Sequence, residues 1–193
     1  MNSISLSVIG PDRPGIVASI TGVLSQLDCS IQDSEMAILR GHFAMMLILT
    51  SPTDVYPQQV EIALAEVATE FCLTIIARPL DDELQTSSEI ANVHGSGPNV
   101  NQLQDSEWTI NVYGTDKIGI VHGVTSCLAQ MGINIISLRT QLSSATSKPI
   151  YAMVIQIRAP HSLGESTLRQ ALDQVSMELD VKISAIPIED ETF

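Results

Sequence analysis

A short motif, Gly-x-Asp-x-x-Gly-Ile-Val, occurs twice and is the most distinctive chemical feature of the chain. The first copy consists of Gly10, Asp12, Gly15, Ile16 and Val17, and the second copy of Gly114, Asp116, Gly119, Ile120 and Val121. Each copy lies between a segment of alternating apolar residues and a segment of helical period. The motif is therefore expected to form a tight turn from a strand into a helix.

Two interpretations of the aspartate in this motif stay open at the level of sequence. As an N-cap residue, it would accept hydrogen bonds from the first amides of the helix and stabilise the helix by about 1 kcal/mol without any ligand. The same amides, at the positive end of the helix dipole, can instead hold the carboxylate of a small molecule. The two glycines of each copy would then let the ligand approach the backbone closely.

The other reactive residue types form no recognisable catalytic or metal site. The four histidines have no second histidine or cysteine at ligand spacing: His42, His94, His122 and His161. No serine lies in a Gly-x-Ser-x-Gly motif, no cysteine has an activating context, and no carboxylate pair stands out. We expect a protein that is not an enzyme and that holds no metal and no cofactor.

The two motif copies belong to a longer internal repeat, because Gly10 and Gly114 begin segments that align without a gap at a spacing of 104 residues. The alignment continues downstream, where Thr21, Leu24, Gln26 and Ile31 match Thr125, Leu128, Gln130 and Ile135. A polar segment rich in serine, glycine and acidic residues separates the copies. The predicted organisation is a first unit at residues 1–80, a linker at 81–106 and a second unit at 107–193.

Each unit is predicted to follow the order β-α-β-β-α-β. In the first unit, strands are expected at residues 3–9, 29–39, 43–50 and 73–80, and helices at 14–27 and 60–71. In the second unit, strands are expected at residues 108–112, 133–142, 150–157 and 181–188, and helices at 120–131 and 168–179, with a loop at 143–149. Both units predict an α+β fold in which a four-stranded antiparallel sheet carries two helices on one face.

RNA-recognition modules share this order of elements, so the segment Arg40-Gly41-His42-Phe43-Ala44 was compared with their third-strand motif. The later aromatic positions are methionine and aliphatic residues here, and the second unit has no counterpart. The formal net charge is −13, from 22 acidic and 9 basic side chains, and the basic residues form no run. We expect no direct binding to nucleic acid or to a membrane surface.

Composition favours a folded protein of a reducing compartment, with 45% hydrophobic and 16% charged residues. No apolar stretch is long enough to span a bilayer, and the first residues lack a basic segment followed by an apolar run. Cys29, Cys72 and Cys127 are odd in number, form no Cys-x-x-Cys motif, and each lies in an apolar stretch where a thiol is expected to pack as a small hydrophobic group. These features predict a cytoplasmic protein.

The sequence resembles the ACT domain family, and its tandem arrangement is similar to that of the glycine cleavage system transcriptional repressors. The matching segments are Gly10-Pro11-Asp12-Arg13-Pro14-Gly15-Ile16-Val17 in the first unit, and Gly119-Ile120-Val121 and Met131-Gly132-Ile133-Asn134-Ile135 in the second. The resemblance implies two ferredoxin-like ACT domains. It also implies that a small molecule, usually an amino acid, binds where the first turn and helix of one unit meet the second strand of another.

By the same resemblance, Asp12, Gly15, Asp116 and Gly119 line such sites, and Asn134 hydrogen-bonds a polar group of the ligand. The first unit departs from the pattern because it has Ser30 where asparagine is expected, and the second unit has Lys117-Ile118 in place of Arg13-Pro14.

The implied function is a repressor-like regulator that senses glycine or another small amino acid and acts on transcription through a DNA-binding protein partner. The alternative is a regulatory subunit of an amino-acid metabolic enzyme. Whether both copies bind, and whether the chain forms a homodimer, stay open.

Overall fold

The computed structural model describes residues 1–80, 105–143, 150–160 and 163–188. The first unit contains β1 (Asn2–Pro11), α1 (Ile16–Gln26), β2 (Ser30–Leu39), β3 (His42–Ser51), α2 (Pro57–Ala63), α3 (Ala65–Phe71) and β4 (Thr74–Pro79). The second contains β5 (Asp105–Thr115), α4 (Ile120–Gln130), β6 (Asn134–Ser143), β7 (Ile150–Pro160), α5 (Glu165–Leu179) and β8 (Lys182–Pro187). The predicted order is confirmed, with one difference: the second helix of the first unit is divided at Leu64 into α2 and α3.

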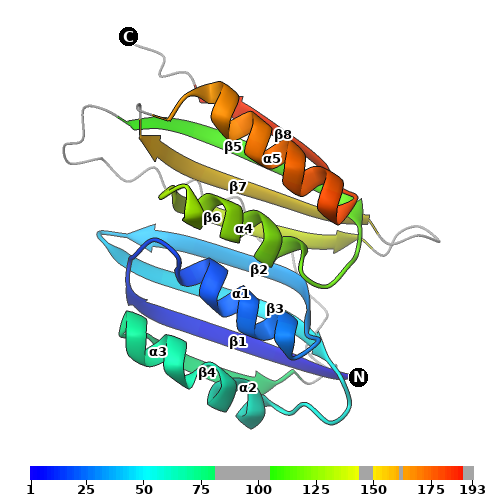
Figure 1. Ribbon diagram of the computed structural model, residues 1–193. Helices are drawn as coiled ribbons and strands as arrows, with labels where there is room; N and C mark the ends of the chain where they lie inside the picture. Colours follow the sequence, from blue (N-terminus) through cyan, green and yellow to red (C-terminus); the bar gives the residue numbers. More distant parts are fainter. Residues whose placement is uncertain (81–104, 144–149, 161–162, 189–193) are drawn as a thin grey trace.

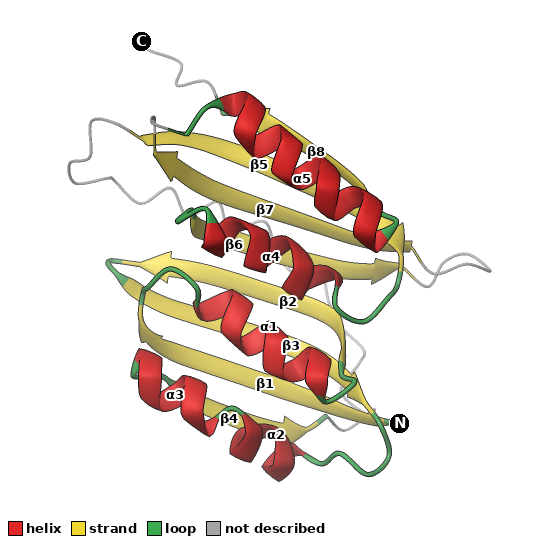
Figure 2. Ribbon diagram, viewed as in Figure 1, coloured by secondary structure: helices red, strands yellow, loops and turns green. Residues whose placement is uncertain are grey.

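The strands of both units form one antiparallel sheet with the order β4-β1-β3-β2-β6-β7-β5-β8. Each unit contributes the four-stranded sheet that its sequence predicts, and the two sheets join edge to edge through β2 and β6. The helices of the described residues lie on one face of this sheet, as Figures 1 and 2 show. The join covers one edge strand of each unit, which leaves fewer unpaired backbone groups open to other chains.

The core lies between the sheet and the helices, and the strand pattern places it there. Ile4, Leu6 and Val8 alternate along β1 and are fully buried on the helix-covered face of the sheet. Trp108, Ile110 and Val112 follow the same pattern along β5 and have at most 6% of their surface exposed. The predicted linker at 81–106 falls outside the described residues up to 104, as does most of the predicted loop at 143–149. The division of the chain at these boundaries stays a prediction.

The two units are related by an approximate two-fold axis. Three contacts join residues that are 104 apart, which is the spacing of the repeat: Thr21 to Thr125, Ala18 to His122, and Glu35 to Arg139. Equivalent residues of two symmetric units meet one another only on the axis that relates them. The axis therefore passes between α1 and α4 in the helical layer and between β2 and β6 in the sheet, and Figure 1 shows the two members of each pair side by side.

Helices α1 and α4 approach closely on this axis because one of them carries a glycine there. A Cβ atom added at Gly22 would lie 2.9 Å from Cε1 of His122, which is closer than side-chain carbons normally come. The His122 ring is held in place by Nδ1, which lies 3.1 Å from the carbonyl oxygen of Ala18 and 3.3 Å from the Ser126 hydroxyl. The packing of the two units thus depends on a specific fit between the helices.

The prediction that each cysteine packs as a buried hydrophobic group is wrong for one of them. Cys29 is buried and Cys127 is half-buried, whereas Cys72 is exposed. Cys72 ends α3 in a left-handed backbone conformation, with φ 57°, and this turn directs its side chain to solvent instead of the core. Among the described helices, none combines the length and the apolar character required to span a membrane.

Candidate functional site

Two clefts lie at the junction of the units, and each is built from the turn of one unit and the second strand of the other. The Asp12 cleft is lined by Asp12, Gly15, Ile16 and Val17 of the first unit and by Asn134 at the start of β6. The Asp116 cleft is lined by Asp116, Gly119, Ile120 and Val121 of the second unit and by Ile31 of β2. Both clefts are narrow and half-open, with an empty volume of about 290 Å³ each when the open mouth is included.

The aspartates of the motif do not cap their helices, so the N-cap interpretation is wrong. Helix α1 begins after Gly15 and α4 begins after Gly119, and both glycines have φ 92°, which glycine adopts without a Cβ clash. The N-cap position is therefore occupied by a glycine three residues beyond the aspartate. The first amides of α1 and α4 therefore have no side-chain cap.

In the Asp12 cleft, the aspartate forms a hydrogen bond to the opposite unit. Asn134 donates from Nδ2 to Oδ2 of Asp12 over 3.2 Å. Burial raises the pKa of Asp12 above its usual value, and the hydrogen bond from Asn134 partly offsets this rise. The carboxylate is therefore half-buried and only partly satisfied by the protein.

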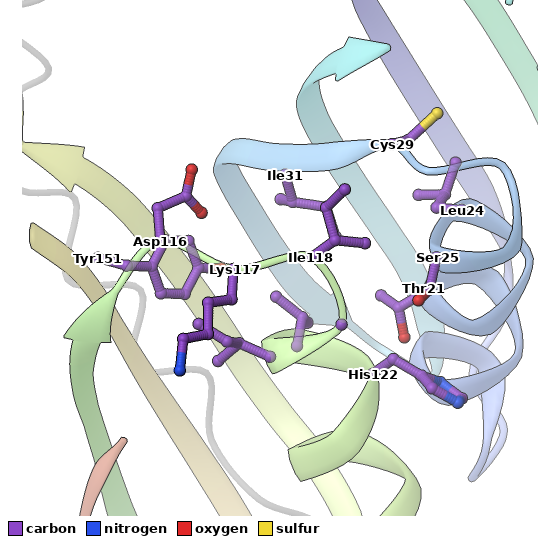
Figure 3. A pocket seen from close by; sticks show the side chains of 13 residues that line it. Thr21, Leu24, Ser25, Cys29, Ile31, Asp116, Lys117, Ile118, His122 and Tyr151 are labelled. Carbon is purple, nitrogen blue, oxygen red and sulfur yellow. The ribbon is translucent and has the colours of Figure 1, made fainter. Parts of the chain in front are cut away.

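In the Asp116 cleft, shown in Figure 3, two other side chains replace the asparagine. Ser30, which aligns with Asn134, donates from Oγ to the Asp116 carboxylate at 3.5 and 3.4 Å. Gln32 lies at a bulge of β2, between the paired residues Ile31 and Asp33, and donates from Nε2 to Ser30 Oγ at 3.0 Å. Burial raises the pKa of Asp116, and the hydrogen bonds of Ser30 and Gln32 partly offset the rise.

The remaining predicted site residues separate into two groups. Gly15, Gly119 and the Ile-Val pairs that follow them line the clefts together with the aspartates. Gly10 and Gly114 lie apart from both linings and instead make room for core side chains. A Cβ atom at Gly10 would lie 2.6 Å from Cδ2 of Leu73, and one at Gly114 would lie 2.7 Å from Cγ1 of Val181.

Each cleft contains a negatively charged group and a partly positive one. The turn of one unit presents a half-buried carboxylate and, three residues further on, the uncapped, partly positive start of a helix. Among the residues that the structure describes, no group of three or more His, Cys, Asp or Glu side chains is placed to hold a metal ion. The arrangement suits a small molecule that carries both a positive and a negative group.

Two ferredoxin-like units that share one sheet and form paired clefts at their junction define a tandem α+β protein. The ACT domain model matches residues 3–77 and 108–185, and the chain belongs to the ACT domain family. This confirms the family and the fold class that the sequence predicts.

Several known proteins are similar to this chain. A UPF0237 protein of Methanopyrus kandleri is 38% identical over 77 residues, which are 39% of this chain and 86% of that protein. The glycine cleavage system transcriptional repressor of Escherichia coli is 40% identical over 45 residues, which are 23% of this chain and 24% of the repressor. The crystal structure of an unknown protein from Galdieria sulphuraria is 26% identical, with 97% of this chain and 99% of that chain covered and a TM-score of 0.43.

Proposed function

We propose that this protein is a non-catalytic regulator that binds a small amino acid in its clefts and transmits their occupancy to a protein partner. The observation that carries this proposal is the pairing, in each cleft, of a half-buried aspartate with an uncapped helix start. The aspartate suits the ammonium group of an amino acid, and the free amides suit its carboxylate. The narrow clefts favour a small side chain.

Ligand binding at this position affects both units at once. Asp12 belongs to the first unit but is held by Asn134 of the second, and Asp116 of the second is held by Ser30 of the first. A ligand that pairs with either aspartate therefore favours one packing of the units over others. If the units can pack in two ways, a ligand shifts the balance between them, and so the surface offered to a partner, by the difference between its affinities for the two packings.

The proposed partner is a DNA-binding transcription regulator. The similarity to the repressor of Escherichia coli, although limited to 45 residues, supports a role in transcription. The net charge of −13 disfavours direct contact with DNA, because protein binding to DNA depends on clustered basic side chains. Regulation would then act through contact between two proteins.

Isothermal titration of the full chain with glycine and the other small amino acids tests ligand binding. We expect saturable binding that weakens about tenfold or more in Asp12→Ala and Asp116→Ala, since each removes a charge-assisted contact to the ligand. Asp173→Ala is the matched control, because Asp173 is an exposed residue of α5 remote from both linings. Absence of heat with every amino acid would overturn the proposal, as would equal losses in the control variant.

Affinity purification of the tagged full chain, with and without the amino acid that binds, tests the partner. We expect a DNA-binding regulator whose recovery changes with the ligand. Recovery of a metabolic enzyme in its place would contradict the transcriptional role and favour the regulatory-subunit alternative.

A further inference from the structure

The two clefts differ at one structurally equivalent position deep in their walls. In β3, Phe43 is the residue paired with Gly10, and in β7, Tyr151 is the residue paired with Gly114. Phe43 lines the Asp12 cleft with 1% of its surface exposed, and Tyr151 lines the Asp116 cleft with 2% exposed. The repeat thus places the same aromatic ring in both clefts and adds a hydroxyl group in only one.

The added hydroxyl is buried and has no hydrogen-bond partner among the described residues. Figure 3 shows the ring of Tyr151 beside Asp116. The Thr140 hydroxyl lies near enough to lower the pKa of Tyr151 slightly, but no contact of normal hydrogen-bond geometry joins the two side chains. Thr140 itself donates to Ser34 Oγ at 2.9 Å. Burial raises the pKa of Tyr151 well above its usual value, and the charges of Asp116 and Asp33 raise it further. The hydroxyl therefore stays protonated and can donate a hydrogen bond.

The side chains near the two rings also differ in polarity. Thr140 beside Tyr151 is matched by Met36, which lines the Asp12 cleft beside Phe43. Its partner Ser34 is matched by Leu138 in the second unit. Tyr151 thus has polar side chains near it and Phe43 has an apolar one, although both rings derive from the same repeated pattern.

A buried hydroxyl without a partner destabilises a folded protein, whereas phenylalanine at the same place avoids this penalty. Phe43 shows that the repeated architecture accommodates phenylalanine at this position. A tyrosine here is best explained by a partner that enters the cleft from outside. That partner must bring a hydrogen-bond acceptor to the wall of the Asp116 cleft.

We propose that the Asp116 cleft selects a small amino acid whose side chain carries a hydrogen-bond acceptor, with a hydroxyl such as that of serine or threonine as the simplest case, and that Tyr151 donates to it. The Asp12 cleft, with Phe43 and Met36 in its wall, favours a ligand without such a group. This inference rests on the proposed binding of amino acids, and it makes the two clefts different in specificity.

Titration of the full chain with L-serine and with glycine, in the wild type and in Tyr151→Phe, tests the inference. We expect the wild type to bind serine more tightly than glycine at one site, and Tyr151→Phe to weaken serine binding about tenfold while glycine affinity changes less than twofold. The free Tyr151→Phe protein should melt at the same temperature as the wild type or higher, because it loses an unpaired buried group. Tyr113→Phe is the matched control, because Tyr113 is an exposed tyrosine of β5 that lies in neither cleft lining, and it should leave both affinities unchanged.

Three outcomes would overturn the inference while leaving amino acid binding intact. The first is unchanged serine affinity in Tyr151→Phe, and the second is an equal loss for serine and glycine. The third is a lower melting temperature of ligand-free Tyr151→Phe, which would show that Thr140 or an ordered water already satisfies the hydroxyl. Failure of the wild type to bind any amino acid would remove the proposed function together with this inference.

Discussion

Replacing Gly22 with alanine tests whether α1 and α4 pack in solution as described. In an isolated helix this change stabilises by about 1 kcal/mol, because alanine is the better helix former. Here the new Cβ would lie 2.9 Å from Cε1 and 3.2 Å from Nδ1 of His122. The ring must move, which costs about 1–3 kcal/mol for overpacking and about 1 kcal/mol for the hydrogen bond to Ala18. We expect Gly22→Ala to lower the free energy of unfolding by about 1–3 kcal/mol.

The assay is urea unfolding followed by circular dichroism and by the fluorescence of Trp108, the single tryptophan of the chain. A double-mutant cycle with His122→Ala separates the two contributions. With the ring removed, the added methyl group has room, so Gly22→Ala should now stabilise the chain. We expect the two changes to be coupled by about 2–4 kcal/mol.

The reasoning would be refuted if Gly22→Ala stabilised the wild-type chain as much as it stabilised the His122→Ala background. That result would mean that the helices of the two units do not touch in solution. The clefts, which require both units, would then not exist in the described form.

Three further predictions follow from the site and the cysteines. Asn134→Ala should destabilise the chain by about 1 kcal/mol in urea unfolding and raise the pKa of Asp12 further, as measured by NMR titration, since the hydrogen bond that lowers this pKa is lost. A lower pKa in the variant would contradict this account. Amino acid affinity should fall as the pH is lowered through the pKa of Asp12, which burial raises above the ordinary aspartate value near 3.9, because the ligand's ammonium group pairs with the ionised carboxylate. Calorimetric titration across this pH range should also detect proton release on binding. An affinity that rises toward acid pH would argue against the pairing. Exposed Cys72 should react first with a thiol reagent and Cys29 only after unfolding, because burial and the charge of Asp28 raise the pKa of the Cys29 thiol to about 11. Equal rates for the two thiols would show that Cys29 is not buried in solution.

The sequence predicts the fold well because periodicity and repetition report the same elements. The alternation of Ile4, Leu6 and Val8 indicates a strand with one buried face, and the structure buries that face completely. The joining of the two sheets through β2 and β6 could not be predicted, because antiparallel pairing of edge strands depends on backbone groups that every residue carries. The repeat alone is compatible with pairing through β2 and β6 and with other ways of packing the two units.

The site was predicted in part. The spacing of Asp12 and Gly15 identifies the turn. An aspartate near a helix start is usually interpreted as an N-cap, and only the left-handed conformation of Gly15 shows that Asp12 is not one. The sequence gives no role to Ser30, although the repeat spacing makes it the equivalent of Asn134 and so offers a signal. Tyr151 was also missed, because the hairpin of the second unit is longer and shifts the alignment of β3 with β7 away from the constant spacing.

The approximate two-fold axis has an evolutionary consequence. In a protein assembled from two identical chains, every substitution would appear twice, and both clefts would change together. Because one polypeptide contains both halves here, Tyr151 can differ from Phe43, and Ser30 from Asn134, without any effect on the opposite copy. Covalent fusion thus frees each cleft to diverge on its own.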